Sequence, residues 1–205
     1  MGIKKVVTYI NDEGFTFQHE PIEDTLKIKK TKTGYEARYL IYDSCPDNPF
    51  ENEGLGDFFH WKDYGREQLI KYCALLGYDI DSREKIGEDN NLAVRIDKYE
   101  HSGISYSVAG EGTQCRWDTS SAWAVWFPNK CLTEDINRFK TKNTRRKRAV
   151  ELARQACETF NQWANGEVYC IVKEEYNNDK EYINHDICGG YLGYEYAEKA
   201  LETDI

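Results

Sequence analysis

The sequence contains no apolar run long enough to cross a membrane. A membrane-spanning helix needs about 18 or more consecutive apolar residues, and the longest apolar stretch here is Ala122–Phe127. The first residues, Met1–Val7, include two lysines and no long apolar core of the kind that a signal peptide carries. We therefore expect a cytoplasmic protein, in a host cell, without a membrane partner.

Cysteine pairs at the spacing of redox or zinc motifs are also missing. The seven cysteines are odd in number and none of them forms a C-x-x-C pair, which argues against a disulfide framework. They lie at positions 45, 73, 115, 131, 157, 170 and 188. Reduced thiols in an intracellular compartment explain this distribution.

Phosphate-binding loops of known type are lacking as well. The two glycine-rich stretches, Gly110–Gly112 and Gly189–Gly193, do not combine a preceding strand, the full glycine spacing and a following Lys-Ser/Thr. The second precedes an expected helix, where an anion would be favoured, but a plain turn explains both. The sequence therefore predicts no cofactor.

The residues that are present suit a globular protein. The chain has 205 residues, of which 40% are hydrophobic and 14% aromatic. A chain of this size buries a core without disulfides or metals. We expect a single domain over residues 1–205, with a possible N-terminal subregion at residues 1–91.

Short alternating runs predict strands joined into antiparallel hairpins. Turn residues separate most neighbouring runs, as at Thr31–Gly34. The expected strands are residues 5–10, 15–18, 25–30, 35–42, 92–98, 104–108, 123–127, 168–174 and 181–188. Residues 44–64 are expected to be a long aromatic loop.

Helical spacing of apolar residues predicts one long amphipathic helix at about residues 144–164. Two shorter helices are expected at Arg66–Leu76 and Tyr194–Leu201, and Thr133–Asp135 should form a helical turn. The predicted fold class is therefore α+β, an antiparallel sheet of hairpins with one long and two shorter helices.

The segment Tyr99–Pro128 is the most distinctive part of the sequence. It holds three of the five tryptophans, one of the four histidines and a glycine-rich reversal between two expected strands. The polar turn Cys115–Ser121 lies between those strands. We predict that Arg116, Trp117 and Asp118 in this turn contact a partner.

The residue types of this segment and its neighbours are compatible with two kinds of chemistry. A cysteine-dependent enzyme would use Cys115 as nucleophile, His101 as base and Asp118 to orient the base. A zinc site would draw on scattered imidazole, carboxylate and thiolate groups. Its candidate ligands are His60, His101, His185, Asp186 and Cys188. Because these ligands lack paired spacing, we predict no metal site.

The net charge of −9 is distributed unevenly. Residues 1–129 carry 15 basic and 22 acidic side chains, residues 130–165 carry 9 and 4, and residues 166–205 carry 3 and 10. Seven cations crowd residues 138–148, including Arg145, Arg146, Lys147 and Arg148. This cluster is the best candidate for contact with the phosphates of a nucleic acid.

Four motifs resemble a family of small proteins carried by tailed phages and conjugative elements. They are E-H-S-G-I-S at Glu100–Ser105, C-R-W-D-T-S at Cys115–Ser120, E-V-Y-C-I-V at Glu167–Val172 and D-I-C-G-G-Y-L-G at Asp186–Gly193. The family-like core covers residues 92–196. The resemblance implies a mobile-element setting and assigns no catalytic residue.

These observations lead to one preferred hypothesis and two alternatives. We expect a non-enzymatic phage or mobile-element protein that binds and inhibits a host defence nuclease or nucleic-acid-binding complex, as anti-CRISPR and anti-restriction proteins do. The first alternative is a nucleic-acid-binding accessory protein that uses residues 138–148. The second is the Cys115 enzyme.

Overall fold

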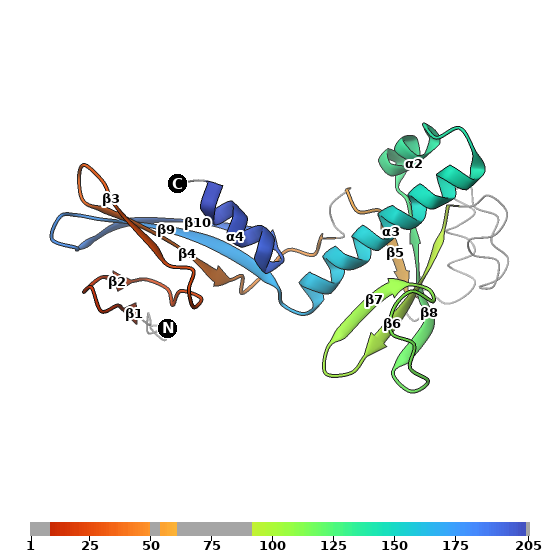
Figure 1. Ribbon diagram of the computed structural model, residues 1–205, viewed down its shortest axis with the longest axis horizontal. Coiled ribbons are helices and arrows are strands. Elements are labelled where there is room, and N and C mark those ends of the chain that lie inside the picture. The colour runs from red at the N-terminus through yellow and green to blue at the C-terminus, as the bar shows by residue number, and fades with distance from the viewer. Residues whose placement is uncertain (1–8, 50–53, 61–91, 204–205) are drawn as a thin grey trace, which may run out of the picture. The chain divides into compact units, whose positions relative to one another are not determined.

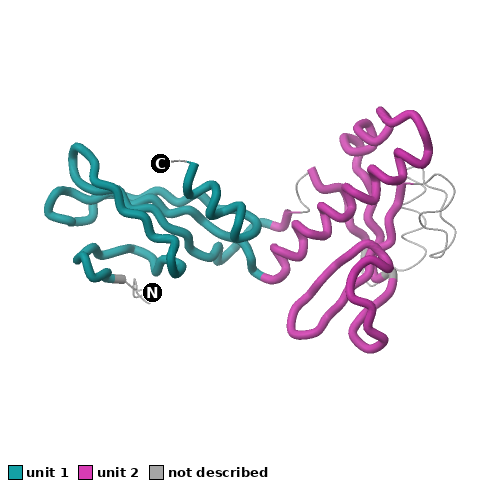
Figure 2. The backbone as a smooth tube through the Cα atoms, in the orientation of Figure 1, with its two compact units in different colours: residues 1–47, 166–205 teal, residues 48–165 magenta. Residues whose placement is uncertain are grey.

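The computed structural model describes residues 9–49, 54–60 and 92–203 (Figure 1). The chain divides into two compact units, the first made of residues 1–47 and 166–205 and the second of residues 48–165 (Figure 2). The expected helix Arg66–Leu76 lies outside the described residues. Whether residues 1–205 form one domain, with a subregion at 1–91, stays a prediction.

The first unit is built on a four-stranded antiparallel sheet with the strand order β10-β9-β4-β3. Its strands are β3 (Lys27–Lys30), β4 (Tyr35–Tyr42), β9 (Val168–Tyr176) and β10 (Tyr182–Leu192). The predicted hairpins β3–β4 and β9–β10 are both confirmed. Strand β4 pairs with β9 and so joins the two hairpins into one sheet.

Strand β10 is longer than predicted. The sequence predicts a turn at Gly189–Gly193, but the strand continues to Leu192 with a register shift between Cys188 and Tyr191. Gly190 has a positive φ of 83° at this irregularity, a conformation that favours glycine. The glycines therefore bend the strand instead of ending it.

Apolar residues cover both faces of this sheet. One face packs against the short hairpin of β1 (Tyr9–Ile10) and β2 (Thr16–Phe17), and the other against α4 (Tyr194–Thr203). The first face buries Phe15, Phe17, Tyr39, Val172 and Tyr176, and the second buries Leu40, Tyr169, Ile171, Ala197 and Leu201. Successive side chains of residues 35–42 thus point into two different cores, as expected for a strand buried on both faces.

The second unit contains a four-stranded antiparallel sheet in the order β5-β8-β6-β7. Its strands are β5 (Asp57–His60), β6 (Val94–Glu100), β7 (Ile104–Val108) and β8 (Thr119–Phe127). The loop expected at residues 44–64 is wrong in part, because the structure has strand β5 within it.

The expected return strand exists, but it does not pair with the strand before it. Strand β8 starts earlier than predicted, at Thr119, and pairs with β6 and β5, while β7 pairs with β6 alone. Ile96 of β6 and Trp126 of β8 are fully buried. Strands β6 and β8 therefore occupy the centre of the sheet, where both of their edges are paired.

The described part of the second unit also contains helices α2 (Lys130–Asn137) and α3 (Lys142–Ala164). The predicted long helix is confirmed as α3, and α2 includes the expected turn at Thr133–Asp135. Thr141 caps α3 and forms a capping box with Thr144, in which each side chain accepts from the other residue's backbone N–H. The apolar side of α3 packs on the sheet through Ala149, Leu152, Ala153, Ala156 and Cys157.

The fold class is therefore α+β, as the sequence predicted. Within residues 9–49, 54–60 and 92–203 it comprises antiparallel sheets, one long helix and two shorter ones.

Candidate functional site

The segment from Cys115 to Asp118, called here the Trp117 tip, is a tight turn immediately before β8. The Cys115 N–H donates to Thr119 Oγ1 at 2.9 Å, and the Thr119 N–H donates back to the Cys115 carbonyl at 3.0 Å. The Glu100 N–H, at the end of β6, donates to the Asp118 carbonyl at 3.0 Å. These hydrogen bonds fix the turn to the end of the sheet.

Trp117 projects from this turn with 84% of its surface exposed. The Arg116 guanidinium lies over its ring at 5.3 Å from the centroid, within the range of a cation–π contact. By contrast, Trp126 is fully buried and donates its indole N–H to the Leu55 carbonyl. An exposed tryptophan on a hydrogen-bonded turn has no role in the core of this unit.

The structure brings Cys115, His101 and Asp118 together around one carboxylate. The Cys115 thiol lies 3.3 Å from Asp118 Oδ2, and His101 Nδ1 lies 3.5 Å from the same oxygen. The carboxylate, and not the imidazole, is therefore the group hydrogen-bonded to the thiol. A thiol nucleophile needs a base against its sulfur, so this order suits a structural clamp better than a catalytic triad.

Asp97 supports the loop that leads into the tip. Its buried carboxylate accepts hydrogen bonds from the Gly110 N–H at 2.9 Å and from Gln114 Nε2 at 3.3 Å. A Cβ at Gly112 would lie 2.2 Å from Ser107 Oγ, so the loop closes against β7 only with glycine there. The role of Asp97 was not predicted, because Arg95, Lys98 and Glu100 of the same strand are charged too and nothing in the sequence sets Asp97 apart.

The basic cluster at the start of α3 is largely engaged within the chain. Arg145 Nε donates to the Phe139 carbonyl at 2.8 Å, at the end of α2. Arg148 forms ion pairs with Asp135 at 3.2 Å and with Glu151 at 3.1 Å. These arginines therefore tie α2 to α3, whatever else they contact.

Arg146, unlike Arg145 and Arg148, contacts the backbone just before strand β6. Its Nη1 donates to the Ala93 carbonyl at 2.5 Å. Burial, together with the nearby Arg95, lowers the pKa of Arg146 below its usual value. The pKa falls because a second cation and partial desolvation both disfavour the charged guanidinium.

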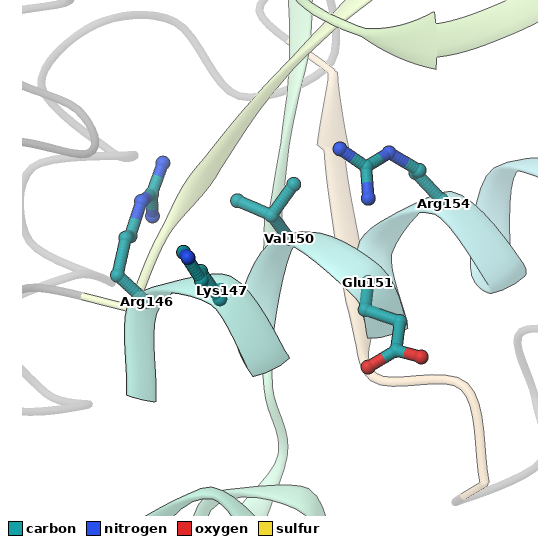
Figure 3. A pocket seen from close by; sticks show the side chains of 5 residues that line it. All are labelled: Arg146, Lys147, Val150, Glu151 and Arg154. Atoms are coloured by element: carbon teal, nitrogen blue, oxygen red, sulfur yellow. The ribbon is translucent and has the colours of Figure 1, made fainter. Parts of the chain in front are cut away.

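A shallow hollow of about 490 Å³ opens along α3 beside this cluster. Figure 3 shows Arg146, Lys147, Val150 and Arg154 on one side of the helix, with Glu151 pointing away from them. Arg154 holds Glu111 through two contacts of 2.6 Å, so its charge is already paired. Among the described residues, no carboxylate forms an ion pair with Lys147.

The possible zinc ligands whose side chains are described do not form a cluster. His101 belongs to the second unit, and its Nδ1 faces Asp118. His185, Asp186 and Cys188 follow one another along β10 of the first unit, where His185 Nδ1 is 2.5 Å from the Tyr182 hydroxyl. Within the described part of the chain, no three His, Cys, Asp or Glu side chains could hold a metal ion.

The fold and the tip define an α+β protein that presents an exposed tryptophan and arginine from a hydrogen-bonded turn. Comparisons with models of protein families, with curated proteins and with solved structures found no match. No helix in the described ranges is long and apolar enough to cross a membrane.

Proposed function

We propose that this chain is a non-catalytic binding protein that docks Trp117 and Arg116 into a pocket on a protein partner. The observation that carries the proposal is the 84% exposure of Trp117 on a turn fixed by backbone hydrogen bonds. Tryptophan and arginine are enriched among residues that dominate binding energy. A preformed turn also loses little conformational entropy on binding.

The partner we propose is a host defence nuclease or nucleic-acid-binding complex in the host cytoplasm. The motif resemblance to proteins of phages and conjugative elements supports this setting. The net charge of −9 supports it too, because an acidic protein is attracted to the basic surfaces with which such complexes hold nucleic acid. Inhibition would follow from occupying that surface.

The test is affinity purification from infected host cells with the tagged wild type and the variant Trp117→Ala. Recovery of the partner should fall by roughly 30-fold or more in the variant, which is the loss expected for a binding hot spot. Tyr196→Ala, which removes another exposed aromatic side chain, serves as the matched control. Equal recovery with Trp117→Ala would refute the role of the tip.

A titration of the captured complex separates inhibition by binding from inhibition by catalysis. A binding inhibitor abolishes the partner's activity at a fixed molar ratio, whereas an enzyme inactivates it at far lower ratios as time passes. We expect the fixed ratio. Time-dependent inactivation by a small fraction of an equivalent would favour the Cys115 enzyme instead.

Three exposed lysines around the start of α3 support a second candidate function, contact with a nucleic acid. Lys140, Lys142 and Lys147 are exposed, and among the described residues no carboxylate pairs with them. If they contact phosphates, retention on DNA or RNA should weaken with salt and should fall further when all three become glutamine. The control replaces Lys29 and Lys30 of β3. Equal retention of the two variants would count against this function.

A further inference from the structure

Three of the four edges of the two four-stranded sheets are protected against pairing with another strand. Strand β3 is short and carries three lysines, and β5 is only 4 residues long. Both features discourage strand addition. The outer edge of β7 is occupied by Asn161 and Asn165 of α3, whose carboxamides bond the backbone of Tyr106 and Ile104.

Strand β10 is the fourth edge and has none of these protections. It is 11 residues long, contains neither lysine nor proline, and among the described residues no strand pairs with its outer side. Ile183 and Ile187 are 58% and 44% exposed. An uncovered edge with exposed apolar side chains is a template for another strand.

We propose that β10 pairs with β10 of a second copy of this chain, in an antiparallel and symmetric dimer. In such a dimer, residue i of one copy lies opposite residue j of the other, and the sum i + j is the same for every pair. Two opposite residues point their backbone N–H and C=O groups either both toward the other strand or both away from it, and this direction alternates from one residue to the next along a strand. The sum is therefore even, so the axis passes through one residue. Because the regular pairing with β9 covers residues 184–188, the axis lies near His185 or Asp186.

Charge selects between these two registers. An axis at Asp186 would set two carboxylates directly opposite each other, which is unfavourable. An axis at His185 sets Asn184 opposite Asp186 of the second copy, and it brings Ile187 beside the irregularity at Ile183 of the second copy. Both contacts occur twice, so we assign the axis to His185.

Sedimentation equilibrium over a range of concentrations tests the dimer. We expect the wild type to associate, more tightly at high salt, because screening reduces the repulsion between two chains of net charge −9. Ile187→Lys should weaken association about tenfold or more, because symmetry removes two isoleucine contacts at once. The control is Ile10→Lys, an exposed isoleucine outside β10.

A wild type that stays monomeric at every concentration, or an Ile187→Lys variant that associates like the wild type while keeping its circular dichroism spectrum, would overturn the proposal.

Disulfide trapping tests the register. In the proposed dimer, His185→Cys brings two sulfurs face to face across the axis and should give a covalent dimer under mild oxidation. Asp186→Cys, its neighbour, would face Asn184 and should not cross-link above the level of the wild type, which has exposed Cys45, Cys131 and Cys188 of its own. Faster cross-linking by Asp186→Cys would overturn the register.

Discussion

The carboxamide of Asn161 bonds both backbone groups of Tyr106. Asn161 Oδ1 accepts from the Tyr106 N–H at 2.6 Å, and Nδ2 donates to its carbonyl at 2.9 Å. One turn further along α3, Asn165 does the same for Ile104, at 3.1 and 2.7 Å. Two side chains of a helix thus take the place of a neighbouring strand and close one edge of the sheet.

We predict that Asn161→Ala destabilises the second unit by about 1–3 kcal/mol, because it leaves a partly buried donor and acceptor without their partner. Urea unfolding measures the free energy, and hydrogen exchange should accelerate at the Tyr106 amide. Gln155→Ala, on an exposed position of the same helix, is the matched control. Unchanged exchange at Tyr106 would show that water replaces the carboxamide without cost.

A second prediction concerns Glu174, whose carboxylate is fully buried in the first unit. Its Oε1 accepts from the Gln18 N–H and the Tyr39 hydroxyl, each at 2.9 Å, and its Oε2 accepts from the Tyr176 hydroxyl. Glu174→Ala should cost at least about 3 kcal/mol, since each unsatisfied buried donor costs about 1–3 kcal/mol.

Thermal and urea unfolding of this variant measure the loss in the free energy of unfolding. Glu175→Ala is the control, because that side chain is half exposed and its 3.6 Å ion pair with Lys173 should contribute less than about 1 kcal/mol. Similar stabilities for the two variants would contradict a structural role of Glu174.

A feature of this fold is predictable from the sequence when residues close together along the chain determine it. The β3–β4 hairpin was predictable because the turn at Thr31–Gly34 lies between its strands. The pairing of Tyr39 with Val172 was not, because it joins segments from opposite ends of the chain and no local pattern records it. The same holds for β8, because its pairing with β5 joins residues 57–60 to residues 124–127.

The site was predictable in part for the same reason. Arg116, Trp117 and Asp118 are neighbours in sequence, so the sequence predicts that they share one turn. The exposure of Trp117 comes from the structure. The contacts of the basic cluster within the chain were less predictable, because charge density along a sequence does not record hydrogen bonds to distant groups. The bond from Arg146 to the Ala93 carbonyl spans the whole central segment of the chain.

A third prediction distinguishes a structural role of the Cys115–Asp118 hydrogen bond from a catalytic role of Cys115. Cys115→Ser keeps a hydroxyl that can donate to Asp118 as the thiol does, so the turn should stay closed. We expect this variant, and His101→Ala, to inhibit the captured partner at the same molar ratio as the wild type, while Trp117→Ala does not. Loss of inhibition in Cys115→Ser, with binding intact, would establish the thiol as a nucleophile.

A fourth prediction follows from buried acids that hold their protons in the native state. Burial, with a smaller effect of Glu111, raises the pKa of the Cys157 thiol to about 12. Burial also raises the pKa of Tyr106 to about 12 and that of Cys170 to about 11. In the unfolded chain these groups ionise near their ordinary values, about 8.5 for cysteine and 10 for tyrosine.

The native state therefore binds more protons than the unfolded state at alkaline pH, and stability falls as the pH rises from about 9 to about 12. Each such proton contributes a slope of up to about 1.4 kcal/mol per pH unit. Cys157→Ala should remove the contribution of one proton from this slope. The cavity that the missing sulfur leaves should lower stability at neutral pH. Urea unfolding at a series of alkaline pH values measures the slope, with Cys131→Ala, an exposed cysteine, as control. A slope unchanged by Cys157→Ala would mean that this thiol already ionises in the folded protein, and that its burial does not hold the proton.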